Sequence, residues 1–202
     1  CEFARADVTV ALSGDGGDEL FAGYDPFKAL ATSQGYQKYF PKRLHPAIEA
    51  MANMLPVSDK NMSFEFKLKR WLRGVGHREA LWGPTWMGAL GHKDIAELFD
   101  CNIDIEDLYS EAIECWDDCA SENIVDRLSE FFVRFYLQDG ILLKSDRASM
   151  LSSLELRSPF LDPDVVEFSQ NLPASMKFRN GETKYILKKA LTGLVPDNIL
   201  YR

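Results

Sequence analysis

The sequence predicts a mainly α-helical protein, a helical bundle attached to a remnant of a parallel α/β sheet. A short apolar run at 8–12 has strand character and leads into a glycine-rich turn. After it, apolar residues recur at helical spacing through most of the chain, and the pattern at 123–143 is long enough for the central helix of a bundle. With 202 residues, of which 46% are hydrophobic, we expect one domain spanning 1–202.

The first elements are a strand and an acidic turn. The turn, residues 13–19, has the sequence Ser-Gly-Asp-Gly-Gly-Asp-Glu. In open α/β sheets, ligands bind at the carboxyl ends of strands. Asp15, Asp18 and Glu19 place carboxylates at this corner, where Mg²⁺ and a phosphate-bearing ligand could meet. The alternative is that these acidic residues only cap the following helix.

Helical patterns account for most of the remaining chain. We expect helices at 25–31, 46–54, 63–73, 92–99, 107–119 and 123–143. Residues 74–91 are expected to be loop-rich, with packed aromatic side chains. The basic cluster Lys67, Lys69, Arg70 and Arg73 is interpreted as a solvated helix face, and the alternative is a phosphate- or partner-contacting surface.

Charged residues gather again after the long helix. They are Lys144, Asp146, Arg147, Glu155 and Arg157, in an otherwise apolar part of the chain. Charges that are buried must be paired, so an internal ion-pair network and a functional site are both open interpretations. Asp162 precedes a proline and is interpreted as a helix N-cap.

Lys184 is expected in the first turn of a helix near the end of the chain. A cation there opposes the helix dipole, so helix stability does not explain it. Its flexible ammonium could contact a polyphosphate or balance charge that develops during a reaction.

Composition excludes several classes of function. The net charge of −8 makes nucleic acid an unsuitable partner, and no apolar run is long enough to cross a membrane. Without a signal-peptide pattern, the default location is the cytoplasm.

Cys115 and Cys119 are interpreted as buried thiols, and His45, His77 and His92 as ordinary residues outside any catalytic spacing.

Four blocks, in order, resemble the synthetase domain of glutamine-hydrolysing asparagine synthetases. They are 13–24 (SGDGGDELFAGY), 145–150 (SDRASM), 154–162 (LELRSPFLD) and 181–187 (GETKYIL). The resemblance implies a sheet of the ATP-pyrophosphatase type. It also implies ATP and Mg²⁺ as cofactors, and adenylation of the aspartate side chain. Ammonia derived from glutamine then attacks to give asparagine, AMP and pyrophosphate.

The resemblance also implies roles for individual residues. Asp18 matches the metal-binding aspartate, and Lys184 matches the lysine that contacts phosphates and the reacting centre. Asp15 stands where glutamate is common and faces the same centre. Positions near the nucleotide and substrate are matched by Ser13, Gly14, Gly16, Asp146, Arg147, Glu155 and Arg157.

Two parts of the family pattern are absent. The sequence has neither the pyrophosphate-binding Ser-Gly-Gly-x-Asp-Ser loop nor an N-terminal glutaminase, so these are expected as partner segments of the same chain. We therefore expect a C-terminal fragment of the synthetase domain that is inactive alone, and leave a homodimer open. The alternatives are a related enzyme, such as a β-lactam synthetase, that acts on another carboxylate, and a non-catalytic helical interaction module.

Overall fold

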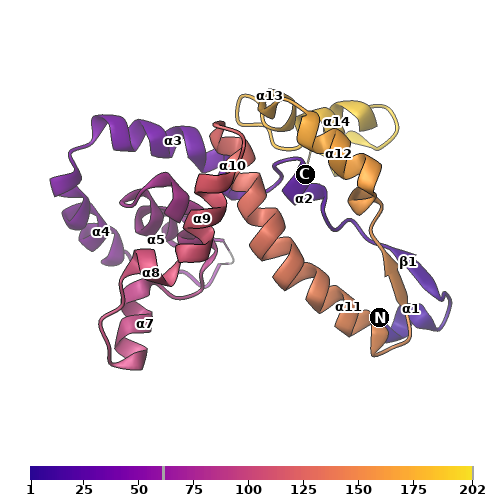
Figure 1. Cartoon of the computed structure of the whole chain (residues 1–202), viewed down its shortest axis with the longest axis horizontal. Helices are drawn as coiled ribbons and strands as arrows, with labels where there is room; N and C mark the ends of the chain where they lie inside the picture. Colours follow the sequence, from indigo (N-terminus) through magenta and orange to yellow (C-terminus); the bar gives the residue numbers. More distant parts are fainter. Residues whose placement is uncertain (61, 202) are drawn as a thin grey trace. The chain divides into compact units, whose positions relative to one another are not determined.

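The computed structural model describes residues 1–60 and 62–201, which form two compact units (Figure 1). Residues 1–28 and 121–201 form the first unit, and residues 29–120 form the second. Helices dominate the described residues, and a two-stranded parallel sheet accompanies them. The predicted fold class, a helical bundle with a remnant of a parallel sheet, is confirmed.

The sheet of the first unit pairs strands that are distant in sequence. Strand β1 (Val10–Leu12) lies parallel to β2 (Glu155–Arg157), with Ala11 opposite Leu156. The turn after β1 leads into α2 (Gly17–Leu20), and β2 leads into a 3₁₀ turn at Pro159–Leu161. Because the strands are parallel, both turns emerge at the same edge of the sheet.

A long helical segment crosses the first unit (Figure 1). It consists of α10 (Ile124–Phe131), a π-helical stretch (Phe132–Leu142) and α11 (Leu143–Met150). The ring of Phe132 is buried, with its centroid 4.6 Å from Tyr24 and 5.5 Å from Phe27. These ring contacts fix the segment after α2 against the long helix.

Short helices complete the first unit. They are α1 (Glu2–Arg5), α12 (Pro163–Asn171), α13 (Ala174–Lys177), α14 (Tyr185–Leu191) and α15 (Asp197–Leu200). The predicted cap at Asp162 is confirmed, because its Oδ1 accepts a hydrogen bond of 3.0 Å from the backbone N–H of Asp164.

The second unit packs its helices around buried tryptophans. Its helices are α4 (His45–Asn53), α5 (Phe64–Val75), α6 (Trp82–Met87), α7 (His92–Phe99), α8 (Ile105–Leu108) and α9 (Ser110–Asp118), with 3₁₀ turns at Lys42–Leu44 and Glu79–Leu81. Trp82 and Trp86 stack at 5.4 Å in the core, as the expected packing of aromatic residues in this segment predicts. Residues 25–28 of helix α3 (Asp25–Tyr39) belong to the first unit and its remaining residues to the second.

Several predicted boundaries are wrong. Helix α3 continues past 31 to Tyr39, although Gly35 weakens it, because Gln37 Nε2 donates to the backbone oxygens of Val75 and His77. Residues 74–91 are largely helical, since Pro84 lies in the first turn of α6, where proline is tolerated. The expected helix at 107–119 is divided between α8 and α9, and the long helix extends to Met150.

The basic cluster of α5 is not a freely solvated face. Lys69 Nζ lies 2.5 Å from Glu65 Oε1 and donates to Leu55 O, while Arg70 donates to the backbone oxygens of Met87 and Gly88. These side chains fix α5 against its neighbours because they satisfy carbonyl groups at chain turns.

The cysteine prediction holds for one residue of the pair. Cys115 is buried in α9, whereas Cys119 follows the helix and is half-buried.

Within residues 1–60 and 62–201, no helix is both long and apolar enough to span a membrane.

Candidate functional site

At the carboxyl ends of the two strands, the acidic turn lies against Ser158, a residue of the block at 154–162. Ser13 N donates to Arg157 O at 2.8 Å, and the hydroxyls of Ser13 and Ser158 lie 2.8 Å apart. Ser13 Oγ also contacts Asp15 Oδ2 at 3.0 Å. Strand pairing therefore positions Ser13 and Asp15 at the edge where α/β sheets bind ligands.

Glycines allow the turn to pass closely under the segment after β2. Gly16 has φ of +91°, a conformation that L side chains rarely adopt, and an added Cβ would overlap Leu161. Gly17 lies against the ring of Phe160. Any side chain at Gly16 would therefore both strain the turn and separate the two segments.

Asp18 and Lys184 meet across a long sequence separation. Lys184 Nζ lies 2.9 Å from Asp18 Oδ1, and both side chains are about one-third exposed, at 30% and 39%. Lys184 N also donates to Phe21 O at 3.1 Å. Lys184 is thus held at the acidic turn by a backbone hydrogen bond to Phe21 and by the ion pair of its side chain with Asp18.

Lys184 has a strained backbone. The prediction that it lies in the first turn of a helix is wrong, because it is the residue before α14, with φ of +54°. A non-glycine residue in this left-handed region is uncommon and is held there by its surroundings. In this position the lysine points at Asp18 rather than along the helix.

Gly23 makes this close approach possible. A Cβ built on Gly23 would overlap Asp18 Oδ1 and Lys184 Cε. The turn that follows α2 therefore packs directly against the ion pair, and only glycine leaves room for it.

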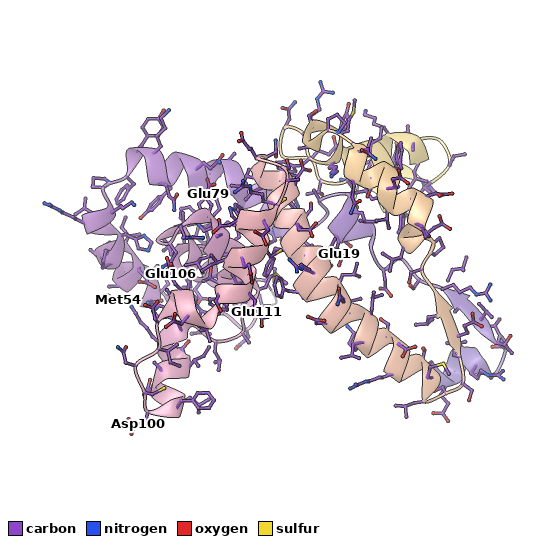
Figure 2. The ribbon with its side chains drawn as sticks, in the orientation of Figure 1. Glu19, Met54, Glu79, Asp100, Glu106 and Glu111 are labelled. Carbon is purple, nitrogen blue, oxygen red and sulfur yellow. The ribbon has the colours of Figure 1, made fainter. Side chains whose placement is uncertain are left out.

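Glu19 and Tyr24 form a buried pair behind the turn. Glu19, labelled in Figure 2, is 1% exposed, and Tyr24 Oη donates to its Oε1 at 2.5 Å. Burial, the hydrogen bond to Glu19 and the charges of Glu19 and Asp18 raise the pKa of Tyr24. Tyr24 therefore remains a protonated donor, and Glu19 is used internally, so its carboxylate is not available at the corner.

Other candidate residues lie on the surface. Asp146 and Arg147 are exposed in α11, and among residues 1–60 and 62–201 no hydrogen bond or ion pair joins their side chains to the acidic turn. Glu155 and Arg157 pair with each other at 2.8 Å while more than half exposed. An internal ion-pair network is therefore the wrong interpretation, because α11 and β2 present these charges to solvent.

The carboxylates at the acidic turn could hold a metal ion only together with a phosphate ligand. Asp15 and Asp18 supply hard carboxylate oxygens, which Mg²⁺ prefers. In the described part of the chain, no cluster of three His, Cys, Asp or Glu residues could hold a metal ion. Mg²⁺ usually takes one or two carboxylates and completes its coordination with phosphates and water, so these residues fit such an ion bridged to a nucleotide.

Sequence reasoning missed the residues whose role depends on close packing. Gly23, Tyr24 and Ser158 lie inside the blocks at 13–24 and 154–162, yet no local pattern marks their contacts. Their position within those ordered blocks is the signal that could have found them.

Comparisons with known proteins show the family of the chain. The family model described as asparagine synthase matches residues 1–202, and the chain therefore belongs to the asparagine synthase family. An asparagine synthetase (glutamine-hydrolysing) of Bacillus subtilis is 29% identical over 98% of this chain, and a putative one of Mycobacterium bovis is 32% identical over 98%. A Penicillium rubens protein named as an amidase is 25% identical over 95%.

The chain spans less than a third of each relative, with 30%, 29% and 31% of their lengths covered. No solved structure gives a significant match.

Proposed function

We propose that this chain is the C-terminal part of the synthetase domain of an ATP-dependent amidotransferase. Its reaction adenylates the side-chain carboxylate of aspartate and transfers glutamine-derived ammonia, giving asparagine, AMP and pyrophosphate. The observation that carries the proposal is the 2.9 Å contact between Lys184 Nζ and Asp18 Oδ1 at the carboxyl end of the sheet. The names of the bacterial relatives support the choice of reaction.

The charges of the pair suit a polyphosphate reaction. Asp18 would hold Mg²⁺, which neutralises phosphate charge when bound. Lys184, released from Asp18, would place its ammonium against the phosphates, where negative charge grows as pyrophosphate leaves. The two side chains are partly exposed, so a ligand can reach both of them.

The turn around the pair would bind the nucleotide and the substrate. Ser13, Gly14 and Gly16 would present backbone and hydroxyl groups to the ligand, and Asp15 would face the acyl centre. Binding roles for Asp146, Arg147, Glu155 and Arg157 require that further segments of the enzyme cover these exposed side chains.

Exposed apolar residues beside the sheet fit the proposal that other segments complete it. Val10, Leu12 and Leu151 are 37%, 73% and 89% exposed. A two-stranded sheet is marginally stable by itself, and parallel sheets are normally covered on both faces. We propose that the pyrophosphate-binding segment continues this sheet, in a cytoplasmic enzyme that also carries a glutaminase.

The test is ATP–pyrophosphate exchange with aspartate, measured on the longer chain that carries this segment. Asp18→Asn and Lys184→Ala should each lower the exchange rate about 10²–10³-fold, the usual loss when one electrostatic group of an active site is removed. Lys28→Ala removes the partner of a different, exposed ion pair, with Asp25 at 3.0 Å, and should leave exchange unchanged. Full exchange in both site variants would refute the assignment.

The same assay separates the remaining candidate functions. Exchange with a different acid but not with aspartate would identify a related amidotransferase or a β-lactam synthetase-like enzyme. Because the fungal relative is named as an amidase, the assay should include carboxylic acids other than aspartate. No exchange with any acid would favour a non-catalytic interaction module.

A further inference from the structure

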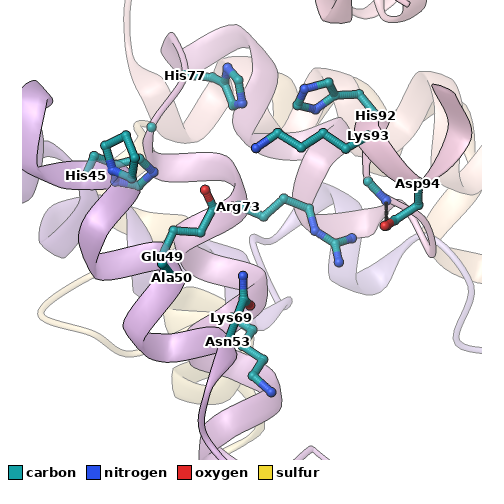
Figure 3. Close-up of a pocket in the computed structure, with 13 residues that line it drawn as sticks. His45, Glu49, Ala50, Asn53, Lys69, Arg73, His77, His92, Lys93 and Asp94 are labelled. Atoms are coloured by element: carbon teal, nitrogen blue, oxygen red, sulfur yellow. Dashed lines mark hydrogen bonds between the residues drawn. The ribbon is translucent and has the colours of Figure 1, made fainter. Parts of the chain in front are cut away.

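The second unit contains a cavity of about 580 Å³ that the proposed reaction does not use. It lies between α4, the end of α5 and the start of α7, and Figure 3 shows the side chains that converge on it. This volume is within the range of pockets that bind small molecules. All its lining residues belong to the unit of residues 29–120.

All three histidines of the chain line this cavity. The rings of His77 and His92 have centroids 5.8 Å apart, and His45 Nδ1 lies 2.9 Å from Tyr36 Oη. The sequence spacing of these histidines does not show that they lie together, but α4 and α7 bring His45 and His92 next to His77 at the end of α5. Among residues 1–60 and 62–201, no cluster with metal-binding geometry exists, so the three rings do not form a metal site.

Among residues 1–60 and 62–201, two cations of the cavity have no carboxylate partner. Lys69 is paired with Glu65, and Asp94 Oδ2 accepts from Gly91 N at 2.8 Å, so both are already engaged. In the part of the chain that the structure describes, Arg73 and Lys93 form no ion pair.

Figure 3 shows the Lys93 ammonium extending between His77 and Glu49, and the Arg73 guanidinium on the side of the cavity where Asp94 lies. Glu49 is the remaining acidic group of the lining, so the available cations outnumber it.

The environment of His77 indicates the same excess of positive charge. Burial lowers the pKa of His77, and His92, His45 and Lys93 lower it further, while Glu49 acts in the opposite direction. An anion in the cavity would offset the repulsion between these groups and favour the protonated imidazole.

We propose that this cavity binds a small anion that bears phosphate groups. Guanidinium, ammonium and imidazole side chains are the groups that bind phosphate through charge-assisted hydrogen bonds. They form an excess of positive charge in a chain whose net charge is −8, so the anion is drawn to this place rather than to the general surface. The proposal is independent of the amidotransferase reaction.

Imidazole NMR on the chain of residues 1–202 tests the proposal, because every histidine signal reports on this cavity. Titration with pyrophosphate and with inorganic phosphate should shift the His77 and His92 signals in a saturable manner. The apparent affinity should rise at least threefold between pH 7.5 and pH 6.0, as binding favours protonated His77. No saturable shift, or saturation by citrate but not by pyrophosphate, would overturn the proposal.

Charge variants of opposite sign make the test specific. Lys93→Gln and Arg73→Gln should each weaken pyrophosphate binding at least fivefold, while Glu49→Gln should strengthen it. In the described residues, the side chains of Lys93 and Glu49 form no hydrogen bond, so these two substitutions remove no hydrogen bond from the fold. Lys38→Gln removes an equal charge from the exposed side of α3 and should change nothing. If Lys93→Gln and Lys38→Gln weakened pyrophosphate binding equally, the NMR shifts would report nonspecific attraction of ions to the protein, and the proposed site would be refuted.

Discussion

At the residue scale, Gly23 controls whether Asp18 and Lys184 can meet. A methyl group on its Cα would occupy the positions of Asp18 Oδ1 and Lys184 Cε. Gly23→Ala should therefore separate the pair and lower ATP–pyrophosphate exchange by the longer chain at least tenfold. Far-UV circular dichroism should remain unchanged, because the clash involves side chains that can move outward.

Gly35→Ala is the matched control for this substitution. An added Cβ at Gly35 meets nothing within 4 Å, and the residue lies inside α3. The change should raise the free energy of unfolding by about 0.5–1 kcal/mol and leave exchange intact. If Gly23→Ala retained the exchange rate of Gly35→Ala, close packing at the ion pair would be irrelevant to the reaction.

Sequence patterns identified Asp18 and Lys184 as candidate residues because each stands out locally. Asp18 lies in a glycine-rich acidic turn, and Lys184 is a cation near a helix start. The contacts of Gly23 and Ser158 could not be predicted in this way. Ser13 and Ser158 are separated by 145 positions, and only strand pairing brings their hydroxyls together.

At the element scale, one ion pair joins α13 to α10. Lys177 Nζ lies 3.0 Å from Asp126 Oδ1, and the lysine side chain is 6% exposed. Asp126→Asn would leave this ammonium buried without a counter-charge, which typically costs about 3–5 kcal/mol. We expect urea denaturation to show a loss of this size, and a loss below about 1 kcal/mol for Lys28→Ala at the exposed pair with Asp25. Equal losses would mean that burial adds nothing to the Lys177 pair.

Helix existence was more predictable than helix length. The N-cap of α12 was predicted from the sequence, and Asp162 Oδ1 accepts from Asp164 N at 3.0 Å. The end of α3 is not visible, because Gln37 is held by carbonyl groups of residues 75 and 77. Tertiary contacts of this kind override local signals such as Gly35.

At the scale of the whole molecule, each unit contributes a separate charged feature. The first unit carries the acidic turn with Lys184, and the second carries the basic cavity with the three histidines. The fold class was predictable because strand and helix periods differ in the sequence. The cavity was not, since its lining comes from α4, α5, α7 and the segments next to them, which only tertiary packing brings together.

The most direct measurement is a solved structure of the longer chain with a non-hydrolysable ATP analogue and Mg²⁺. The central claim predicts a magnesium ion about 2.1 Å from an Asp18 oxygen. It also predicts Lys184 Nζ about 2.7–2.9 Å from a phosphate oxygen, in place of its contact with Asp18. A nucleotide bound elsewhere, with the pair between Asp18 and Lys184 undisturbed, would contradict it.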